Sequence, residues 1–575
     1  MENYAVIYEN ESLQKAIEHI NEVSRSGGEP GIGIIVDEYK EVKGVITDGD
    51  FRNLICRSVS FEERVGAHIS SEFFHVFDDM SSREMLDEIF SNFKSPISGK
   101  DPRLSKVIVL NKDKKFKGIT NVFDLYKSDD ISLKTVSVYG LGYVGLTLAL
   151  TFAEAGVDTV GVDINEELCN QLSLGRPHFF ERGLDSLLEA CLSEKKIRFQ
   201  PTSKAKASDI YVISVGTPVN EGGEVIYSYL EKAATDISKV LKEGNLIILR
   251  STVPVGTSRK KVVGILEEGS GLVAGVDFHL AFAPERTVEG NALNELKTLP
   301  QIIGGLTKKC SSLAGRVFST FNSTIVNVDT LEAAEIIKLI NNTYRDTVFS
   351  FANDIAALCD DYNVNAFNVI RAANEGYPRN PIPLPSPGVG GICLVKDPFL
   401  YQASFKKPKD HFGKFSRTIN SNVVDRIYSN FKQKKEKIGL KDKTVMVVGL
   451  AFKGDPETSD MRFSPSIDLI DRLVADNFKV LAWDKVVLKE NIDQIPGVEY
   501  CDLLSGIKEA GSVFFMNNHK SNNQFNSHHV FKESCEEANS VKIVFDGWSL
   551  FRQKELESIK NLHYMTLGYC TSKEV

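Results

Sequence analysis

A chain of 575 residues is too long for a single hydrophobic core, so its length predicts several domains. Its 42% hydrophobic and 25% charged residues are typical of a globular protein and exclude a disordered or low-complexity chain. A formal net charge of -9 argues against broad nucleic-acid binding, and no apolar stretch approaches the roughly 18 residues that a membrane span needs.

The start of the chain and its cysteines indicate the cellular compartment. The first residues are polar and acidic and contain no apolar run, which is untypical of a secretory signal. The nine cysteines are an odd number and include no CxxC pair. They are typical of reduced thiols, so we expect a cytoplasmic protein with neither a disulfide framework nor a metal site.

Residues 1–130 contain a weak internal duplication. In each half an apolar strand and a turn are followed by a glycine and an acid, and Gly44 and Asp50 have the same spacing as Gly118 and Asp124. The pattern resembles a pair of CBS domains, regulatory modules that often bind adenine nucleotides.

The CBS resemblance implies a nucleotide site in this module. Thr47 and Asp50 would hold a ribose in the first half, and Asp124 takes the matching position in the second half. Asn121 stands where that second half would have its threonine. The alternative is a module that only promotes self-association.

A glycine motif follows a polar linker at residues 127–134. The predicted strand at residues 135–139 leads into Gly140, Gly142 and Gly145, which open a helix that ends near Gly156. Gly140 allows a tight turn, Gly142 lets a pyrophosphate approach the backbone, and Gly145 permits close helix packing.

The next predicted strand, residues 159–162, ends in Asp163. A carboxylate there can bond both ribose hydroxyls and repel a 2'-phosphate, so the sequence predicts NAD rather than NADP. The alternative, a purely structural glycine turn, gives Asp163 no task.

Apolar strands recur at residues 210–214, 246–249 and 279–282 between helical stretches, which predicts a doubly wound parallel sheet. Ligands bind at the carboxyl ends of such strands, where this chain has polar loops. Thr217 and Thr252 lie in two of these loops and either line the site or cap helices.

A long helix is predicted from Thr330 to about Cys359. Along it a polar stripe at helical spacing interrupts an otherwise apolar surface: Glu335, Lys338, Asn342 and Arg345. Because the other sides of the helix are apolar too, the stripe is expected to be buried. A buried lysine needs a partner or a chemical task.

Residues 388–398 place a cysteine in a glycine-rich turn. Gly390 and Gly391 leave the thiol of Cys393 open to a substrate carbon, and Lys396 and Asp397 follow within one helical turn. A cation there can keep a thiolate charged, and a carboxylate can direct a proton or a water. The alternative is a small buried cysteine beside a turn.

A second alternating unit begins with a strand at residues 444–448. Its helix starts at Ser464 and Pro465, a cap followed by a first-turn proline, and its second strand ends in Asp484. The full glycine fingerprint is missing, so we expect a different nucleotide here, with Lys453 and Arg462 free for phosphates.

Taken together, the motifs between residues 134 and 575 resemble the UDP-glucose/GDP-mannose dehydrogenase family. The resemblance implies an α/β fold in which two doubly wound Rossmann-like domains are joined by a central helical dimerisation region and preceded by the CBS pair. The expected domains are residues 1–130, 134–328 (NAD-binding), 329–430 (central, with the cysteine loop) and 441–575 (binding the UDP-sugar).

The family implies an NAD-dependent, two-step oxidation of a nucleotide-sugar hydroxymethyl group to a carboxylate, in a homodimer or higher homo-oligomer. Carried over by position, Cys393 is the nucleophile, Lys338 and Asn342 stabilise the oxyanion, Asp397 and Thr252 manage water and protons, and Glu285 assists thioester hydrolysis. The cofactor would be held by Gly140, Gly142, Tyr143, Val144, Gly145, Asp163, Thr217 and Lys396. The substrate would be held by Glu289, Lys453, Arg462 and Arg379, the last reaching it from a neighbouring subunit.

Two departures from the family pattern concern the substrate. The chain has Phe463 where the family usually has a glutamate before Ser-Pro, and Trp548 where an arginine usually follows Asp-Gly. The run Pro284-Glu285-Arg286 with Gly290-Asn291 is most similar to the branch that oxidises UDP-N-acetylhexosamines, so we favour UDP-GlcNAc or UDP-ManNAc over UDP-glucose. The competing interpretations are a two-electron hydroxyacid dehydrogenase and a non-catalytic nucleotide sensor.

Overall fold

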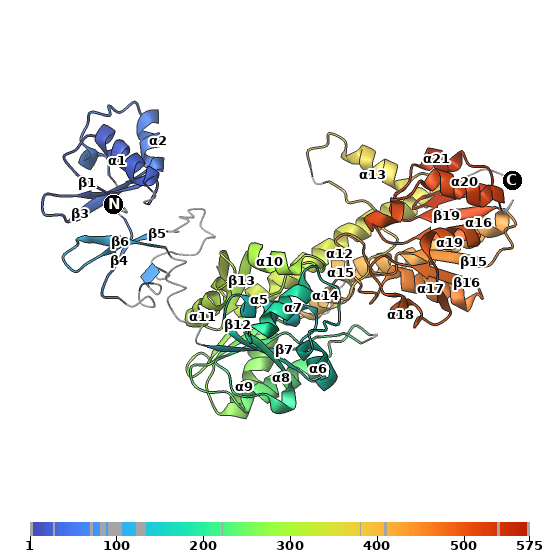
Figure 1. The fold of residues 1–575 in the computed structure, drawn as a ribbon, viewed down its shortest axis with the longest axis horizontal. Coiled ribbons are helices and arrows are strands. Elements are labelled where there is room, and N and C mark those ends of the chain that lie inside the picture. Colours follow the sequence, from blue (N-terminus) through green and yellow to red (C-terminus); the bar gives the residue numbers. More distant parts are fainter. Residues whose placement is uncertain are drawn as a thin grey trace. The chain divides into compact units, whose positions relative to one another are not determined.

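The computed structural model describes residues 4–26, 29–69, 73–80, 85, 88–89, 106–121, 131, 134–220, 222–379, 381–407, 411–537 and 541–571. The chain forms two compact units, Met1–Ile131 and Ser132–Val575 (Figure 1).

The first unit contains two three-stranded sheets with the same arrangement. In each, the middle strand is parallel to the first and antiparallel to the third, with a bulge near the end of the antiparallel pair. Val42 donates its amide hydrogen to the carbonyl of Lys114 at 3.0 Å and so joins the two halves. The elements are β1 (Ala5–Tyr8), α1 (Leu13–Arg25), β2 (Ile32–Val36), β3 (Val42–Thr47), α2 (Asp48–Cys56), β4 (His75–Phe77), β5 (Lys106–Leu110) and β6 (Phe116–Asn121).

The first sheet of the second unit has eight strands in the order β14-β13-β12-β11-β10-β7-β8-β9. All neighbours are parallel except β12 and β13, so the predicted doubly wound parallel sheet is confirmed. The strands are β7 (Thr135–Tyr139), β8 (Asp158–Asp163), β9 (Ile197–Pro201), β10 (Ile210–Ile213), β11 (Leu246–Leu249), β12 (His279–Phe282), β13 (Gln301–Gly305) and β14 (Ile325–Val328). The connecting helices are α5 (Tyr143–Glu154), α6 (Glu166–Ser173), α7 (Leu184–Ser193), α8 (Ser228–Ser238), α9 (Val263–Ser270), α10 (Ala292–Thr298) and α11 (Lys308–Ser319).

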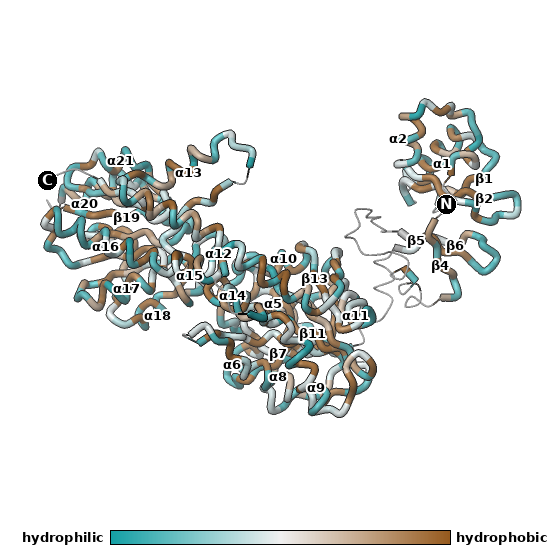
Figure 2. The backbone as a smooth tube through the Cα atoms, turned by 180° about the vertical axis from the view of Figure 1, so that it is seen from behind, coloured by the Kyte–Doolittle hydropathy of each residue, from teal (hydrophilic) through white to brown (hydrophobic). Residues whose placement is uncertain are grey.

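The order of this sheet locates a ligand site. The chain proceeds from β7 to β8 in one direction and continues with β10 on the other side of β7. In open α/β sheets ligands bind outside the carboxyl ends of the strands at such a switch point. The inner strands β7 and β11 are almost entirely buried. Strand β11 is hydrophobic throughout (Figure 2).

Central helices connect the two sheets of the second unit (Figure 1). The longest, α12 (Leu331–Tyr362), begins at the cap Thr330, whose hydroxyl accepts the amide hydrogen of Ala333 at 3.0 Å. It ends at Asn363 in the left-handed conformation and is about 48 Å long at 1.5 Å per residue. The other central helices are α13 (Ala366–Asn374), α14 (Ile392–Ala403), α15 (Phe412–Ser421) and α16 (Val423–Lys437).

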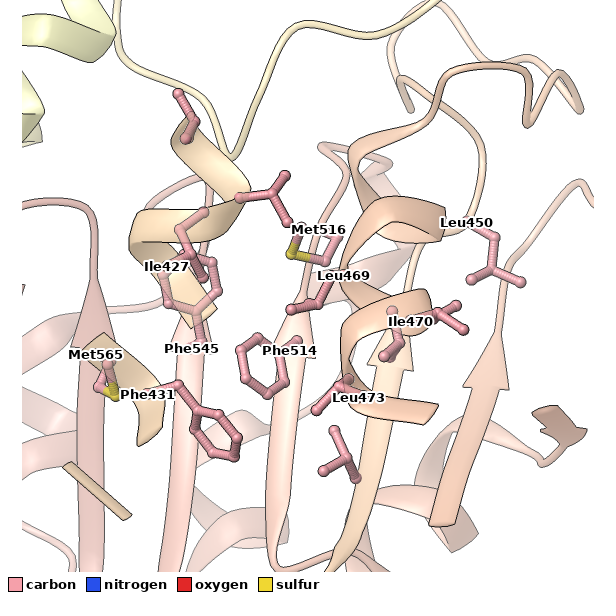
Figure 3. Close-up of a cluster of buried hydrophobic side chains, with 14 of the residues drawn as sticks. Ile427, Phe431, Leu450, Leu469, Ile470, Leu473, Phe514, Met516, Phe545 and Met565 are labelled. Atoms are coloured by element: carbon pink, nitrogen blue, oxygen red, sulfur yellow. The ribbon is translucent and has the colours of Figure 1, made fainter. Parts of the chain in front are cut away.

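The second sheet has seven strands in the order β17-β16-β15-β18-β19-β20-β21, antiparallel only between β20 and β21. Helices α16 and α17 cover one face, where Phe431 meets Phe514 edge to face with ring centroids 5.0 Å apart (Figure 3). The strands are β15 (Thr444–Val448), β16 (Lys479–Trp483), β17 (Val498–Tyr500), β18 (Ser512–Phe515), β19 (Lys542–Asp546), β20 (Leu562–Thr566) and β21 (Tyr569–Cys570). The helices are α17 (Pro465–Ala475), α18 (Lys489–Ile492), α19 (Leu503–Glu509), α20 (Ser527–Glu537) and α21 (Gln553–Glu557).

Among the described residues, no helix combines the length and apolar character needed to cross a bilayer. Within the same ranges, no group of three or more His, Cys, Asp or Glu side chains is arranged to hold a metal ion. All nine cysteines are free thiols.

Candidate active site

The glycine motif forms a cradle at the carboxyl end of β7. Gly140 has a φ of 89°, and a Cβ added to Gly145 would lie 1.8 Å from the carbonyl oxygen of Gly140, so both positions require glycine. A Cβ added to Gly142, at the N-terminus of α5, would meet no atom within 4 Å. This open space beside the free amides of a helix N-terminus, which includes that of Val144, suits the pyrophosphate of NAD.

Asp163 lies at the end of β8, beside this cradle. One of its carboxylate oxygens accepts the amide hydrogen of Leu141 at 2.8 Å, and the other accepts that of Asn165 at 2.9 Å. Since each carboxylate oxygen can accept a further hydrogen bond, ribose hydroxyls can still be bound. The residues present therefore fit a dinucleotide.

Tyr143, predicted to contact the cofactor, is the first residue of α5, and its side chain is part of a buried network. Its hydroxyl bonds to the buried carboxylate of Glu181, which also accepts the amide hydrogens of Gly290 and Ala292 at 2.7 and 2.9 Å. Burial, followed by Glu181, holds the pKa of Tyr143 far above its usual range. This network fixes the loop after β12 against α5.

Thr217 and Thr252 are linked to each other and cap no helix. The Thr217 hydroxyl, which is buried, donates to the carbonyl oxygen of Thr252 at 2.5 Å. The contact joins the loops after β10 and β11, while the side chain of Thr252 stays partly exposed. Both residues therefore lie at the expected edge of the sheet.

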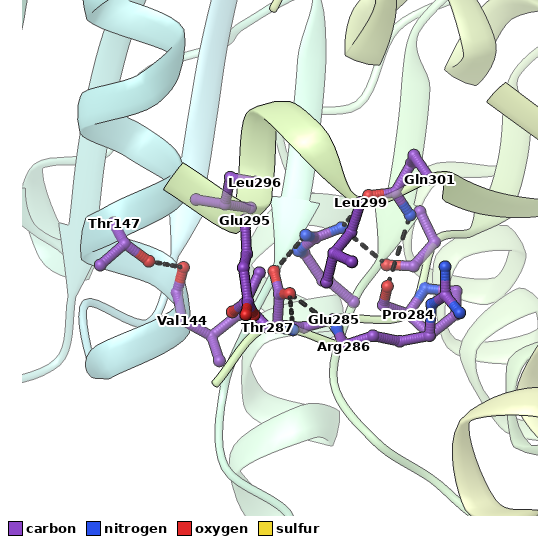
Figure 4. Close-up of polar contacts among 12 residues, drawn as sticks. Val144, Thr147, Pro284, Glu285, Arg286, Thr287, Glu295, Leu296, Leu299 and Gln301 are labelled. Atoms are coloured by element: carbon purple, nitrogen blue, oxygen red, sulfur yellow. Dashed lines mark hydrogen bonds and ion pairs between the residues drawn. The ribbon is translucent and has the colours of Figure 1, made fainter. Parts of the chain in front are cut away.

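Glu285 is held in a fully occupied pocket rather than left free as a base (Figure 4). One carboxylate oxygen pairs with the buried guanidinium of Arg250, and the other accepts the amide hydrogens of Arg286 and Thr287 at 2.6 and 2.7 Å. Burial alone would raise the pKa of Glu285, but Arg250, the Thr287 amide and Lys338 outweigh it and lower that pKa. Glu285 is thus a fixed negative charge.

Helices α12 and α14 bring four predicted residues together. The amide of Asn342 donates to one oxygen of Asp397 at 2.5 Å, and the ammonium of Lys396 lies 2.7 Å from the other. Lys338 is only 8% exposed, and its ammonium has no hydrogen bond or ion pair to any described residue. Its charge lowers the pKa of both Glu285 and Cys393.

Cys393 is the second residue of α14, where the N-terminus of the helix favours a thiolate. The side chain is reachable from solvent, yet protein atoms surround the thiol on most sides. This burial, together with Asp397, raises the pKa of Cys393, and Lys338 and Lys396 oppose the rise. The expected charged thiolate is therefore disfavoured in this structure, because burial and the charge of Asp397 outweigh the two lysines.

The glycines before Cys393 are explained by packing as well as by access. A Cβ on Gly390 would lie 2.5 Å from the carbonyl oxygen of Phe463, and Gly391, with a φ of 82°, would meet the ring of Phe452 at 2.8 Å. The turn therefore fits tightly against the second sheet domain. Its glycines dock the cysteine loop there.

Glu289, Lys453 and Arg462 bring the second sheet domain to the same site. Lys453 donates to the carbonyl oxygen of Glu289 at 2.6 Å, and Arg462 pairs with Asp460 at 2.7 Å. Burial, followed by Asp460, raises the pKa of Glu289 to about 7. The electrostatic partners of Cys393 and of Arg462 both include Glu289, which places these groups around one centre.

The second sheet domain is closed to a dinucleotide at its first turn, as expected from its degenerate motif. One carboxylate oxygen of Asp484 accepts hydrogen bonds from the backbone amides of Leu450 and Ala451 and from the side-chain amide of Asn517. The other oxygen accepts the backbone amide hydrogens of Val486 and Val487. A Cβ on Gly449 would lie 2.4 Å from the Asn517 side chain. Asp484 thus has no free capacity for a ribose.

Arg379 has no bond to the described residues of this centre, and Thr47 and Asp50 belong to the amino-terminal unit. Arg379 is exposed, with its guanidinium 5.4 Å from the ring centroid of Tyr377, and it bonds to none of the described residues around Cys393. Thr47 and Asp50 form a capping box at the start of α2, in which the Thr47 hydroxyl donates to Asp50 at 2.7 Å. Asp124 lies outside the described residues.

Sequence reasoning missed Glu181, Arg250 and Asp460. Each acts through a partner that is distant in the chain or through a loop whose shape depends on packing. Arg250 could have been recognised in the sequence, because a charged residue directly after the apolar strand β11 is expected to be buried and to pair with an acid.

Family models match most of the chain. The UDP-glucose/GDP-mannose dehydrogenase family is matched by its NAD binding domain at residues 134–322, its central domain at 332–423 and its UDP binding domain at 446–553. The CBS domain model matches residues 1–57.

Individual relatives agree with this. The UDP-N-acetyl-D-mannosamine dehydrogenase of Pyrococcus horikoshii is 33% identical over 423 residues, which are 73% of this chain and 96% of the relative. The NDP-N-acetyl-D-galactosaminuronic acid dehydrogenase of Ralstonia nicotianae is 32% identical over 402 residues, 68% of this chain and 92% of the relative. The solved UDP-N-acetyl-mannosamine dehydrogenase of Staphylococcus aureus superposes with a TM-score of 0.64 at 31% identity and covers 76% of this chain and 98% of its own.

The three family domains follow one another in the order in which the chain forms its NAD cradle, its central helices and its second sheet. The cradle around Gly142 and Asp163 fits the NAD that this family uses. The chain therefore belongs to the UDP-glucose/GDP-mannose dehydrogenase family of NAD-dependent nucleotide-sugar dehydrogenases, and it carries an N-terminal CBS domain.

Proposed function

We propose that the protein oxidises the C6 hydroxymethyl group of a UDP-N-acetylhexosamine, UDP-ManNAc or UDP-GlcNAc, to a carboxylate. The observation that carries the proposal is the buried Lys338, whose ammonium has no partner among the described residues and acts on Cys393. A cation beside the thiol that pairs with no described residue is available for a negative charge that arises only during the reaction. The names of the relatives from Pyrococcus and Ralstonia support an N-acetylated sugar.

The oxidation removes four electrons, and Cys393 allows the second pair to leave. NAD, when bound in the cradle of α5, accepts a hydride in each oxidation. Between them the Cys393 sulfur adds to the aldehyde carbon, and the carbonyl π electrons become an alkoxide that takes up a proton. The second oxidation of this thiohemiacetal leaves a thioester, which water cleaves to the carboxylate and the free thiol.

Lys338 and Asn342 stabilise the oxygen on which negative charge develops. One N–H of the Asn342 amide is bound to Asp397, and the other remains to donate to that oxygen. Asp397 holds Asn342 and Lys396 in place and, with Thr252, directs water and protons. Glu285 keeps the Lys338 ammonium oriented through its fixed charge and acts on thioester hydrolysis in that way.

Substrate phosphates are held by the second sheet domain. In this structure Lys453 donates a hydrogen bond to a backbone carbonyl oxygen, and Arg462 forms an ion pair with Asp460. The two phosphates of a UDP-sugar can replace these contacts with stronger, charge-assisted hydrogen bonds. Glu289 lies between these two cations and the thiol and faces the sugar.

The active assembly is a homodimer formed along α12. Six large apolar side chains on this helix are exposed at helical spacing: Ile336, Ile340, Tyr344, Phe351, Leu358 and Tyr362. A continuous apolar stripe on a helix of this length is typical of an interface with a second copy. In that dimer Arg379 reaches the partner's substrate. Tyr344→Glu is expected to give monomers in sedimentation velocity, and an unchanged dimer would refute the interface.

The amino-terminal unit binds an adenine nucleotide through its first half, with Thr47 and Asp50 turned from their mutual capping box to the ribose. Calorimetry with AMP, ADP and ATP tests this on the full chain. Asp50→Asn should remove binding and leave the basal rate unchanged, whereas Asp48→Asn, in the same turn, should keep both.

The substrate proposal is tested by the NADH formed per molecule of sugar across UDP-ManNAc, UDP-GlcNAc and UDP-glucose. Two NADH per molecule of an N-acetylated sugar would support the proposal. Two NADH with UDP-glucose, and none with the other two sugars, would show that UDP-glucose is the substrate. One NADH would indicate a two-electron hydroxyacid-type dehydrogenase, and none a nucleotide sensor.

A further inference from the structure

A cavity of about 290 Å³ lies at the C-terminal end of α12 and shares no residue with the candidate active site. Three parts of the chain build it: the end of α12, one face of α16 and the hairpin of β20 and β21. The volume is at the lower end of the range for small-molecule sites, too small for a dinucleotide but sufficient for a small metabolite.

The charges that line this cavity are unbalanced. Arg426, Lys434 and Lys437 of α16 face it, and Asp360 is the one acidic residue among its lining residues. Asp360 forms an ion pair with Arg426, in which the Nε of Arg426 lies 2.8 Å from the Asp360 carboxylate. Among the described residues that line the cavity, no other acidic side chain is left to balance the two lysines.

The two lysines differ in their burial and in their contacts. Lys434 is 6% exposed, and its ammonium donates to the neutral carbonyl oxygen of Thr571 at 2.7 Å. Burial lowers the pKa of Lys434, Cys570 opposes the change, and Lys437 adds to it. Lys437 is exposed at the mouth of the cavity and forms no hydrogen bond or ion pair with any residue that the structure describes, so its ammonium is available to a ligand. The buried ammonium of Lys434 thus has only a neutral carbonyl oxygen as its partner among the described residues. A buried cation without a counter-charge is rare, so an anion that binds between the two lysines explains the arrangement.

The rest of the wall indicates the kind of anion. Asn430 and Gln433 add amide groups beside the lysines, and the buried Phe545 and Met565 form an apolar side. Lysine, arginine and amide donors together suit the oxygens of a phosphate, and the apolar side suits a carbon skeleton. We propose that this cavity binds a small phosphate monoester, held by Lys434 and Lys437 with its carbon skeleton against Phe545.

Isothermal titration of the full chain with glucose 1-phosphate, and with inorganic phosphate as the head group alone, tests the proposal. Glucose 1-phosphate should bind saturably and more tightly than phosphate, and both should weaken as salt is added. Lys437→Gln should raise the dissociation constant about tenfold or more, because one charged hydrogen bond is lost. Lys441→Gln, which removes an exposed charge that is not in the wall, should leave it unchanged.

A second measurement locates the ligand. Cys570 lines the cavity and is partly exposed, so glucose 1-phosphate should slow its alkylation by iodoacetamide, with the labelled site identified by mass. Protection of Cys570 in the unchanged protein and its loss in Lys437→Gln support the site. No saturable binding at millimolar concentration, equal weakening by the two lysine variants, or an unprotected Cys570 would each overturn it.

Discussion

The side-chain amide of Asn342 on α12 donates a 2.5 Å hydrogen bond to Asp397 on α14, a carboxylate with no exposed surface. The second oxygen of Asp397 lies 2.7 Å from the ammonium of Lys396. One buried carboxylate thus fixes two neighbouring groups and also acts electrostatically on the thiol of Cys393, whose pKa it raises after burial. The site is organised by a residue that need not touch the substrate.

Removing the charge of Asp397 should lower the pKa of Cys393. Asp397→Asn leaves the shape nearly unchanged and takes away the carboxylate that opposes thiolate formation, while Lys338 and Lys396 remain. The rate of Cys393 alkylation should then begin to rise at a lower pH than in the unchanged protein. The variant should also lose about 3 kcal/mol of stability, because a buried ion pair is broken. Asp361→Asn, on the exposed side of α12, is the control, and an identical alkylation profile would contradict the prediction.

Replacing Cys393 by serine should abolish net acid formation. A serine hydroxyl is a much weaker nucleophile, so the aldehyde cannot be converted to the adduct that loses the second hydride. Binding of NAD and of the UDP-sugar should stay nearly intact, because the side chain is solvent-accessible at the start of α14 and only one atom changes. Turnover by the serine variant at the unchanged rate would rule out the covalent route.

Lys338→Ala should slow the reaction about 100-fold, the scale on which the loss of one oxyanion donor is measured. Cofactor binding, measured by fluorescence quenching with NADH, should not change, because the cradle at Gly142 is built from other residues. The melting temperature should fall little, since the ammonium has no partner to lose among the described residues. A fall in stability without a fall in rate would indicate a structural lysine.

Glu289 should give the reaction a pH dependence near neutrality. Burial and Asp460 raise its pKa to about 7, from an ordinary value of 4.5. The rate profile of kcat/KM should therefore bend near pH 7, and Glu289→Gln should remove the bend. The same shift affects the free energy of unfolding, because the folded protein binds the Glu289 proton more tightly than the unfolded chain does. The stability that Glu289 contributes is therefore largest below pH 4.5, decreases as the pH rises to about 7, and is constant above that pH. A bend that persists in Glu289→Gln belongs to another group.

Asp163→Asn should weaken NAD and reduce the preference over NADP. The amide can still accept a backbone hydrogen from Leu141 or Asn165, so the turn is preserved better than in Asp163→Ala. Its lack of charge removes the repulsion of a 2'-phosphate. Michaelis constants for both cofactors check this, and a ratio equal to that of the unchanged protein would show that Asp163 does not contact the ribose.

The sequence by itself determined the elements and the family. The strand at residues 135–139, the glycine turn at Gly140, the helix cap Ser464 and the long helix from Thr330 were all predicted where the structure has them. These features depend on neighbours in the chain: alternation, caps and glycines at positive φ. The order of the family motifs is likewise a property of the sequence, and it identified the NAD cradle.

Only the tertiary structure decided the electrostatic state of the site. Arg250 forms an ion pair with Glu285, and the Tyr143 hydroxyl donates a hydrogen bond to Glu181. Lys396 is paired with Asp397 rather than with the thiol of Cys393. These partnerships join residues that are not related by any short-range pattern, or they depend on which of two neighbouring groups packing brings closer. Burial has the same origin, because the number of protein atoms around Cys393 or Glu289 follows from how the domains close around them, and this burial sets their pKa values.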